Sequence, residues 1–277
     1  PGVFSKQSIL KDESQQLDPY KLAADEDDIE EYIIPDYNAY FQSLRDNGLD
    51  SVKPVVFFET SRGCPWAQCY FCGIDGYNTC HRKMEPSTAI QYLNNIMQYA
   101  DRCKYFIGTD SSMPYEYIEQ VLPYVSIPKD VYILYETSVK LTEREIQNLV
   151  QNRVKLLLAG IESLVTPTLK SLNKDATAFD NILFLKNCRN AGGAVNWNLL
   201  AGIPNNDTDD LKLYTQMIPK ITHLYPPSGI WLISFQGPSD YVMNQSKHNI
   251  CLETYIKQLE YLYPFEKQSL QNMAYFH

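Results

Sequence analysis

Three cysteines crowd into nine positions of one short stretch, ETSRGCPWAQCYFC, as Cys64, Cys69 and Cys72. Thiolates this close together are typical ligands of zinc or of an iron–sulfur cluster. A structural zinc site needs four ligands, and Cys80 could be the fourth. Three thiolates alone suit a cubane cluster whose remaining iron is open to an outside ligand. The spacing therefore predicts a metal centre and leaves both kinds open.

The composition of the 277-residue chain limits which partners the protein could bind and in which compartment it could act. A formal net charge of −9 favours neither a nucleic-acid partner nor an anionic membrane surface. No apolar run reaches the roughly eighteen residues that a membrane span needs. The seven cysteines are odd in number and unevenly spaced, which is a poor disulfide framework. We therefore predict a protein of the reducing cytoplasm, where clustered thiols more often bind metal.

The elements that must position the cysteines alternate between strands and helices from Val55 onward. Six apolar, β-rich runs are predicted at 55–61, 104–110, 131–138, 154–163, 194–204 and 229–235. One of the intervening helices opens at a capping box of Thr142 and Glu145. Another, at 209–225, is expected to kink or break at Pro219. The alternation predicts an α/β fold whose parallel sheet is either doubly wound or a partial barrel.

Polar side chains follow most of these strands at their carboxyl ends. They are Glu59, Thr60, Asp110, Glu136, Ser138, Glu162, Ser163 and Asn198. Ligands bind at this edge of a parallel sheet in both architectures. Taken singly, each side chain is more often a helix cap or a loop hydrogen bond than a ligand contact. A polar set spread over so many strands favours the barrel, whose loops share one site, over a single crevice.

Four motifs resemble those of the radical S-adenosylmethionine (radical SAM) enzymes: SRGCPW…CYFCG, GIESLVTPTLKSLNK, WNLLAGIP and YLYPF. The first motif departs from the family pattern, because four residues separate its first two cysteines where three are common. Together the motifs look like a subgroup that modifies ribosomally made peptides, many of whose members carry a cobalamin-binding domain. The resemblance implies a partial (β/α)6 TIM-type barrel of radical SAM type.

By similarity to the family, Cys64, Cys69 and Cys72 would be the metal ligands of a [4Fe–4S] cluster. The open iron would chelate S-adenosylmethionine, whose reductive cleavage gives a 5′-deoxyadenosyl radical. The cofactors supply this chemistry, while the protein positions the reactants and excludes water. The resemblance also implies an electron donor, either a reductase or a flavodoxin-type protein.

The resemblance implies cofactor-binding roles for three residues near the methionine end of S-adenosylmethionine. Lys174, in SLNK, would pair with the carboxylate, because a carboxylate is best bound by a cation. Asp110, after the second strand, would lie near the amine. Glu162, in GIES, would meet the methionine moiety or the ribose.

Three further residues are implied at the nucleoside end of the same cofactor. Phe71 would lie near the adenine. Glu136 and Asn198 would accept hydrogen bonds from the ribose hydroxyls, since hydroxyls need paired acceptors. Ser138, which ends the same strand as Glu136, is included as a further cofactor contact.

The chain divides into three predicted regions. Residues 1–50 form an acidic linker, in which 25–31 hold six carboxylates. A segment near residue 40 is apolar enough to dock onto a folded body. The core barrel spans 51–240, and 241–277 form an aromatic segment that packs on the barrel or leads into further chain. In the subgroup that these motifs resemble, a segment like PGVF…IPDYNAYF joins a cobalamin-binding domain to the radical domain. The resemblance therefore implies that a cobalamin-binding domain preceded Pro1 and that more chain followed His277.

The predicted function is a radical SAM enzyme that modifies a ribosomally made peptide, by C-methylation if cobalamin is present. Epimerisation or cross-linking without cobalamin is the alternative within the family. A structural zinc module, in which Cys80 completes the ligand set, is the alternative outside it. A degenerate barrel that only scaffolds a partner is a further alternative, which the intact set of three cysteines disfavours.

Overall fold

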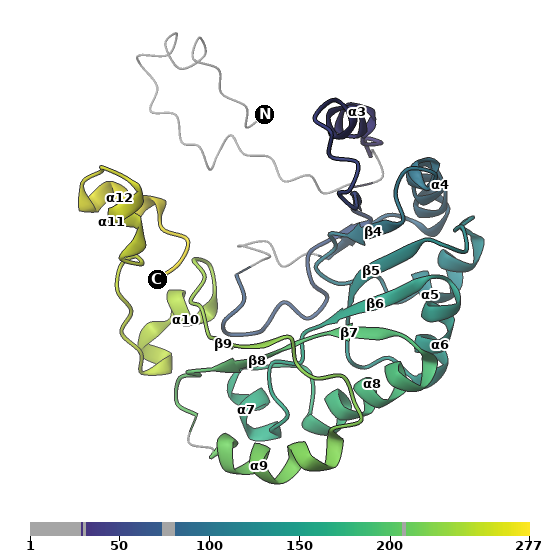
Figure 1. Cartoon of the computed structure of the whole chain (residues 1–277). Helices are drawn as coiled ribbons and strands as arrows, with labels where there is room; N and C mark the ends of the chain where they lie inside the picture. The colour runs from purple at the N-terminus through teal and green to yellow at the C-terminus, as the bar shows by residue number, and fades with distance from the viewer. Residues whose placement is uncertain (1–28, 30–31, 74–80, 207–208) are drawn as a thin grey trace.

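The computed structural model describes residue 29 and residues 32–73, 81–206 and 209–277 as an open arc of strands with helices outside it (Figure 1). Five parallel strands form the main sheet in the order β1-β4-β5-β6-β7. Their bounds are β1 Val55–Phe58, β4 Tyr105–Gly108, β5 Tyr132–Thr137, β6 Val154–Ala159 and β7 Ala194–Asn196. Each strand lies within one of the predicted β-rich runs. Parallel pairing between successive strands requires a crossover connection, which the intervening helices provide.

A second parallel pair, β8 (Asn198–Ala201) and β9 (Gly229–Leu232), continues the arc. The backbone N–H of Leu200 donates to the carbonyl of Glu162 at 2.8 Å, which joins β8 to the chain just after β6. All six predicted strands are therefore present, and the prediction of a partial (β/α)6 TIM-type barrel is confirmed.

The predicted run 194–204 is divided between the two sheets at Trp197. Its indole is 2% exposed and donates to the carbonyl of Tyr225 at 3.0 Å. Two short strands, β7 and β8, lie on either side of Trp197 in different sheets, so a single strand across 194–204 is wrong.

The predicted strand 55–61 also ends early, at Phe58. The N–H of Thr60 donates to the carboxylate of Asp110 at 3.1 Å instead of joining the main sheet. The chain then forms β2 (Ser61–Arg62), which pairs antiparallel with β3 (Arg82–Lys83). This small pair closes the base of the segment that carries the three cysteines.

Helices cover the convex side of the main sheet (Figure 1). They are α4 (Pro86–Ile96), α5 (Tyr117–Gln120), α6 (Glu143–Gln151) and α8 (Ala178–Ala191), with 3₁₀ turns at Met97–Tyr99 and Leu122–Tyr124. The predicted capping box of Thr142 and Glu145 opens α6. A second capping box at Thr177 opens α8, which ends at Gly192 with a φ of 77°. Glycine reaches this left-handed conformation without steric cost.

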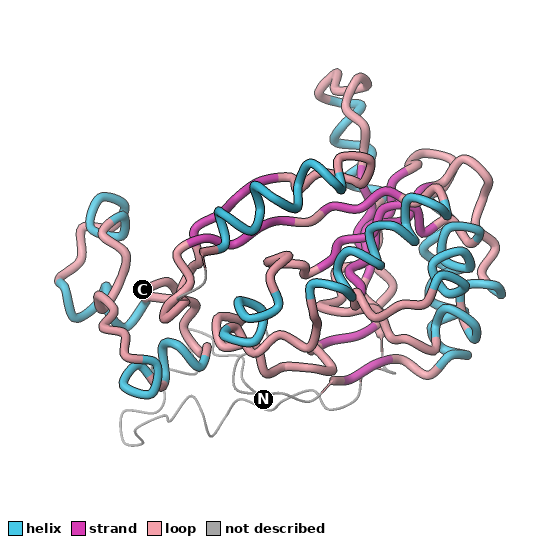
Figure 2. Tube along the Cα trace, turned by 90° about the horizontal axis from the view of Figure 1, so that it is seen from below, coloured by secondary structure: helices cyan, strands magenta, loops and turns pink. Residues whose placement is uncertain are grey.

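The remaining helices lie towards the second strand pair and the C-terminus. They are α7 (Thr166–Ser171), α9 (Asp210–Ile221), α10 (Asp240–Met243), α11 (Gln258–Leu262) and α12 (Lys267–Met273), with a 3₁₀ turn at Gln245–His248. The expected break at Pro219 does not occur, because α9 continues through this proline to Ile221, although proline cannot donate the backbone hydrogen bond of its position. The views of Figures 1 and 2 both place the C-terminal helices across the molecule from the helices over the main sheet.

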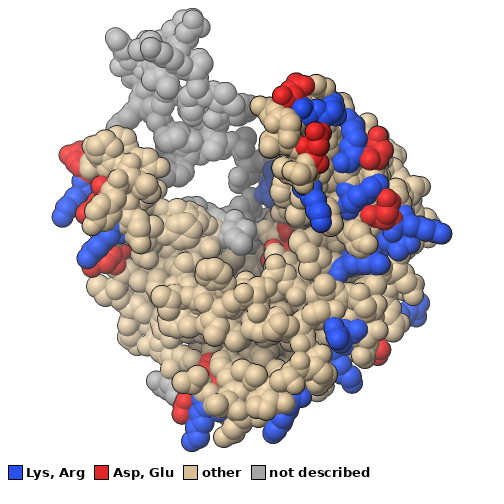
Figure 3. Space-filling model, viewed as in Figure 1, with Lys and Arg blue, Asp and Glu red and all other residues tan. Residues whose placement is uncertain are grey.

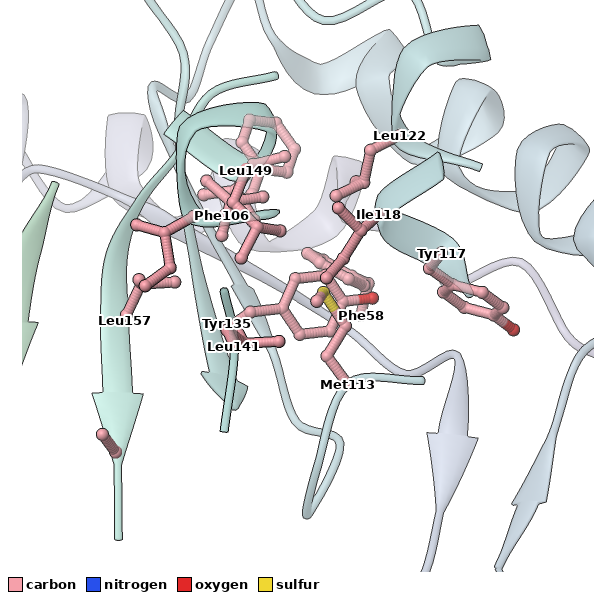
Figure 4. Close-up of a cluster of buried hydrophobic side chains, with 14 of the residues drawn as sticks. Phe58, Phe106, Met113, Tyr117, Ile118, Leu122, Tyr135, Leu141, Leu149 and Leu157 are labelled. Carbon is pink, nitrogen blue, oxygen red and sulfur yellow. The ribbon is translucent and has the colours of Figure 1, made fainter. Parts of the chain in front are cut away.

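The hydrophobic core lies between the main sheet and its covering helices (Figure 4). Phe106, Tyr117 and Leu157 are each 0% exposed within it. Burying a large apolar side chain contributes about 1.5–3 kcal/mol, so this layer fixes the positions of the strand ends.

The segment before β1 docks on this core through α3 (Asn38–Asp46), as expected from its aromatic residues. Phe41 is 4% exposed, and the Tyr37 hydroxyl donates to the carbonyl of Phe57 at 2.6 Å. Except for Ile29, the acidic run 25–31 lies outside the described residues. In the part of the chain that the structure describes, no helix is long and apolar enough to cross a membrane.

Candidate active site

A cavity of about 240 Å³ lies at the carboxyl ends of the central strands. Five of the ten predicted site residues line it: Cys64, Cys69, Glu136, Ser138 and Lys174. Parallel strands end at the same edge, so residues far apart in the sequence meet there. The structure therefore brings half of the predicted set into one place.

The segment 63–73, here called the cluster loop, carries the three cysteines and is held by the turn that follows α7. The Trp66 indole donates to the carbonyl of Asn173 at 2.8 Å, and the Asn173 amide donates to the carbonyl of Gln68 at 2.7 Å. The backbone N–H of Tyr70 donates to the carbonyl of Leu172 at 3.0 Å. Three hydrogen bonds between segments about a hundred residues apart thus fix one side of the loop.

The same turn places Lys174 in the cavity. Asn173 has a φ of 54°, a left-handed conformation that asparagine tolerates better than most residues. Lys174 Nζ then lies 3.4 Å from Glu162 Oε1, with the two side chains 17% and 16% exposed. Burial lowers the pKa of Lys174, but the attraction of the Glu162 carboxylate more than offsets this effect. The pKa of Lys174 is therefore raised above its ordinary value. A cation is therefore held beside the cysteines.

Glu162 adopts a φ of 59°, which is unusual for a residue that is not glycine. Such a conformation costs on the order of 1–3 kcal/mol and often marks a functional site. Gly160 lies against the same ion pair, since a Cβ there would be 2.8 Å from Lys174 Nζ and 3.0 Å from Glu162 Oε1. The predicted motif GIES therefore forms a close-fitting cradle for Lys174.

The thiols of the cluster loop influence one another electrostatically. Burial raises the pKa of Cys69 to about 12, Lys174 opposes this shift, and Cys72 and Cys64 add to it. Among the described residues, no three histidine, cysteine or acidic side chains gather around a point where a single ion could bind. Three neighbouring thiols near a cation are a donor set that fits an anionic iron–sulfur cluster. Cys80 lies outside the described residues.

Glu136 and Ser138 line the cavity from the end of β5. Ser138 Oγ accepts a hydrogen bond from the backbone N–H of Lys140 at 3.2 Å. Phe71 and Asn198 do not line the cavity. Phe71 packs in a separate apolar cluster around Tyr241, and Asn198 Oδ1 accepts a hydrogen bond from the Trp231 indole at 3.0 Å. Their roles in binding S-adenosylmethionine remain predictions.

Asp110 is buried beneath the strand ends and does not line the cavity. Its carboxylate accepts from the Thr60 hydroxyl at 2.7 Å, and that hydroxyl lies 2.7 Å from the hydroxyl of Tyr135. Burial raises the pKa of Asp110 to about 6, although hydrogen bonds from Ser61 and Thr60 oppose the shift. The network ties the ends of β1, β4 and β5 together.

Several lining residues were not among the predicted site residues. They are Pro65, Trp66, Ser111, Ser112, Thr137, Val139, Gly160, Asp175 and Ala176. Most of them directly follow a strand or the cysteine motif, so the rule that strand ends form the site could have indicated them. A search for polar residues would not find Gly160, which contributes by leaving space for the side chains of Lys174 and Glu162.

The model of the radical SAM superfamily matches residues 58–217, which is more than half of the chain. This chain therefore belongs to the radical SAM superfamily, and the resemblance inferred from its motifs is confirmed. No curated protein matches the sequence.

Solved structures of cobalamin-dependent radical SAM enzymes share the fold. The radical S-adenosylmethionine methyltransferase TsrM from Kitasatospora setae is 11% identical with a TM-score of 0.58, over 70% of this chain and 39% of its own. OxsB with aqua-cobalamin bound is 14% identical with a TM-score of 0.61, over 90% of this chain and 41% of its own. At these identities the likeness shows the fold alone, and this chain spans less than half the length of either protein.

Proposed function

We propose that this chain is the radical-generating part of an enzyme in which Cys64, Cys69 and Cys72 bind a [4Fe–4S] cluster. The observation that carries the proposal is the single cavity that Cys64 and Cys69 share with Lys174. When bound, such a cluster supplies the electron that cleaves S-adenosylmethionine to give a 5′-deoxyadenosyl radical.

The chain's own residues would bind and orient S-adenosylmethionine. Lys174 is the cation suited to its carboxylate, and Glu162 fixes the position of that cation. Glu136, which lines the same cavity, is an acceptor suited to a hydroxyl or an ammonium group. The half-buried cysteines and the closed base of the cluster loop would keep water from the radical.

The proposed substrate is a ribosomally made peptide, and the proposed outcome is C-methylation with cobalamin. The motif resemblance supports the peptide. The strands form an open arc that does not close into a full barrel, which suits a large substrate (Figure 1). The fold shared with TsrM and OxsB supports the use of cobalamin. A reductase or flavodoxin-type donor in a reducing cytoplasm would supply the electron.

The test is anaerobic reconstitution of the chain with iron and sulfide, followed by S-adenosylmethionine and dithionite. We expect a brown protein that forms 5′-deoxyadenosine, and no product from Cys69→Ala. Cys251→Ala is the matched control, because Cys251 is an exposed cysteine away from the cavity. A colourless protein with one tightly bound zinc would overturn the proposal.

A further inference from the structure

The chain after β9 contacts the cluster loop at two points, Tyr70 and Gly73, which flank Cys72. The backbone carbonyl of Tyr70 accepts a hydrogen bond from the N–H of Tyr241, at 2.9 Å. Since the N–H of Tyr70 is already bonded to Leu172, both backbone groups of this residue are fixed by separate parts of the molecule.

The ring of Tyr70 belongs to a cluster of three rings. Its centroid lies 4.7 Å from that of His248 and 5.9 Å from that of Tyr241. The rings of Tyr241 and His248 are themselves 4.8 Å apart. His248 is 8% exposed and Tyr241 is 1% exposed, so the contact is buried.

A close contact with Asp240 holds His248 in this cluster. His248 Nε2 lies 2.5 Å from Asp240 Oδ2, and Lys247 Nζ donates to the same oxygen at 2.9 Å. Burial alone would raise the pKa of Asp240, but hydrogen bonds from Lys247 and His248 lower it to about 2. Asp240 is therefore ionised at neutral pH, and its carboxylate orients the imidazole of His248 through Nε2.

Gly73 is held by the C-terminal segment on both of its backbone groups. Its N–H donates to Gln236 Oε1 at 2.8 Å, and its carbonyl accepts from the Tyr275 hydroxyl at 3.2 Å. A Cβ at this position would be 2.9 Å from Pro238 Cδ. The contact is thus too close for any side chain, and the backbone of the loop is pressed against the C-terminal segment.

From these contacts we infer that Gln236, Tyr241, His248 and Tyr275 form a clamp that positions Cys69 and Cys72 for binding the cluster. The inference rests on the proposed function. Tyr70 lies between these two cysteines and Gly73 follows the second, so the clamp acts on the ligands through their neighbours. Outer residues that orient metal ligands typically contribute a factor of about 10–100 in metal affinity.

The test compares the reconstituted wild-type chain with His248→Ala and Gln236→Ala. His223→Ala is the matched control, because His223 is exposed and outside the clamp. Three quantities are measured: the thermal unfolding of the iron-free protein, the rate at which iron is lost to a chelator, and the electron paramagnetic resonance spectrum of the reduced cluster with and without S-adenosylmethionine.

We expect both clamp variants to lose iron about tenfold faster than the wild type, with altered cluster spectra and the control unchanged. Gln236→Ala removes one hydrogen bond to Gly73 and should leave unfolding of the iron-free protein unchanged, which separates positioning from folding. If the wild type holds a cluster and Gln236→Ala matches it in iron loss and spectrum, the clamp alone is overturned. If the wild type holds no cluster, the proposed function falls and the clamp falls with it.

Discussion

The two strand groups of this barrel differ sharply in how they bury their apolar residues. In the main sheet, Phe106 and Leu157 are 0% exposed beneath the outer helices. In the second pair, β9 exposes Ile230 by 70%, Trp231 by 60% and Leu232 by 79%. The sequence of β9, GIWL, is itself apolar, so the difference in exposure reflects what covers the strands.

The comparison shows that the cavity rests mainly on the well-packed group. Glu136 lies near the end of β5 and Gly160 directly follows β6, and both strands are anchored in the core. The second group is attached more loosely, since none of the residues Asp210–Ile221 of α9, all of which the structure describes, is buried. Figure 3 shows that charged side chains crowd the rim over the outer helices, whereas few lie across the middle of this face. We expect local stability to follow the same division.

The largest expected effect comes from the same substitution made in each group. Leu157→Ala leaves a cavity in the core and should lower the free energy of unfolding by about 2–5 kcal/mol. Leu232→Ala changes a side chain that is 79% exposed and should lower it by less than about 0.5 kcal/mol. Urea denaturation of the iron-free protein measures both. Equal losses would show that β9 is covered in solution.

The network at Asp110 should make the main sheet sensitive to pH. The pKa of the folded state, about 6, lies above the ordinary 3.8, so protonation favours folding. The contribution of Asp110 to stability should be fully present below about pH 4 and should be lost as the pH rises through about 6, by on the order of 3 kcal/mol in full. In Asp110→Asn this decrease should disappear from the unfolding curve.

The control for that experiment is Asp101→Asn, because the side chain of Asp101 is 73% exposed. It should keep the pH dependence of the wild type. Persistence of the full decrease in Asp110→Asn would assign it to other carboxylates and remove Asp110 from the account.

The smallest expected effect comes from removing the N-terminal cap of one helix in each strand group. Thr142→Ala removes a capping box from α6, which buries Ile146 and Leu149, and should lower global stability by about 1 kcal/mol. Asp209→Ala removes the cap of α9, whose contacts are only half-buried. It should instead speed amide hydrogen exchange within α9 and leave global unfolding unchanged. A loss of global stability in Asp209→Ala would show that both groups unfold as one unit.

The sequence by itself determined the local elements and the family. Hydrophobic runs indicated the six strands, Thr142 and Glu145 specified the start of α6, and the cysteine spacing predicted a metal centre. These features depend on residues a few positions apart, which local geometry relates directly.

Only the tertiary structure decided which of the polar strand-end residues share the cavity. Asp110 and Glu136 both end a strand, yet one is buried under the site and the other lines it. Asn173 and Gln236 hold the cluster loop from positions about 100 and 160 residues away along the chain. Such contacts depend on how strands and helices pack, and no local pattern encodes that packing, because it is set by the joint burial of distant side chains.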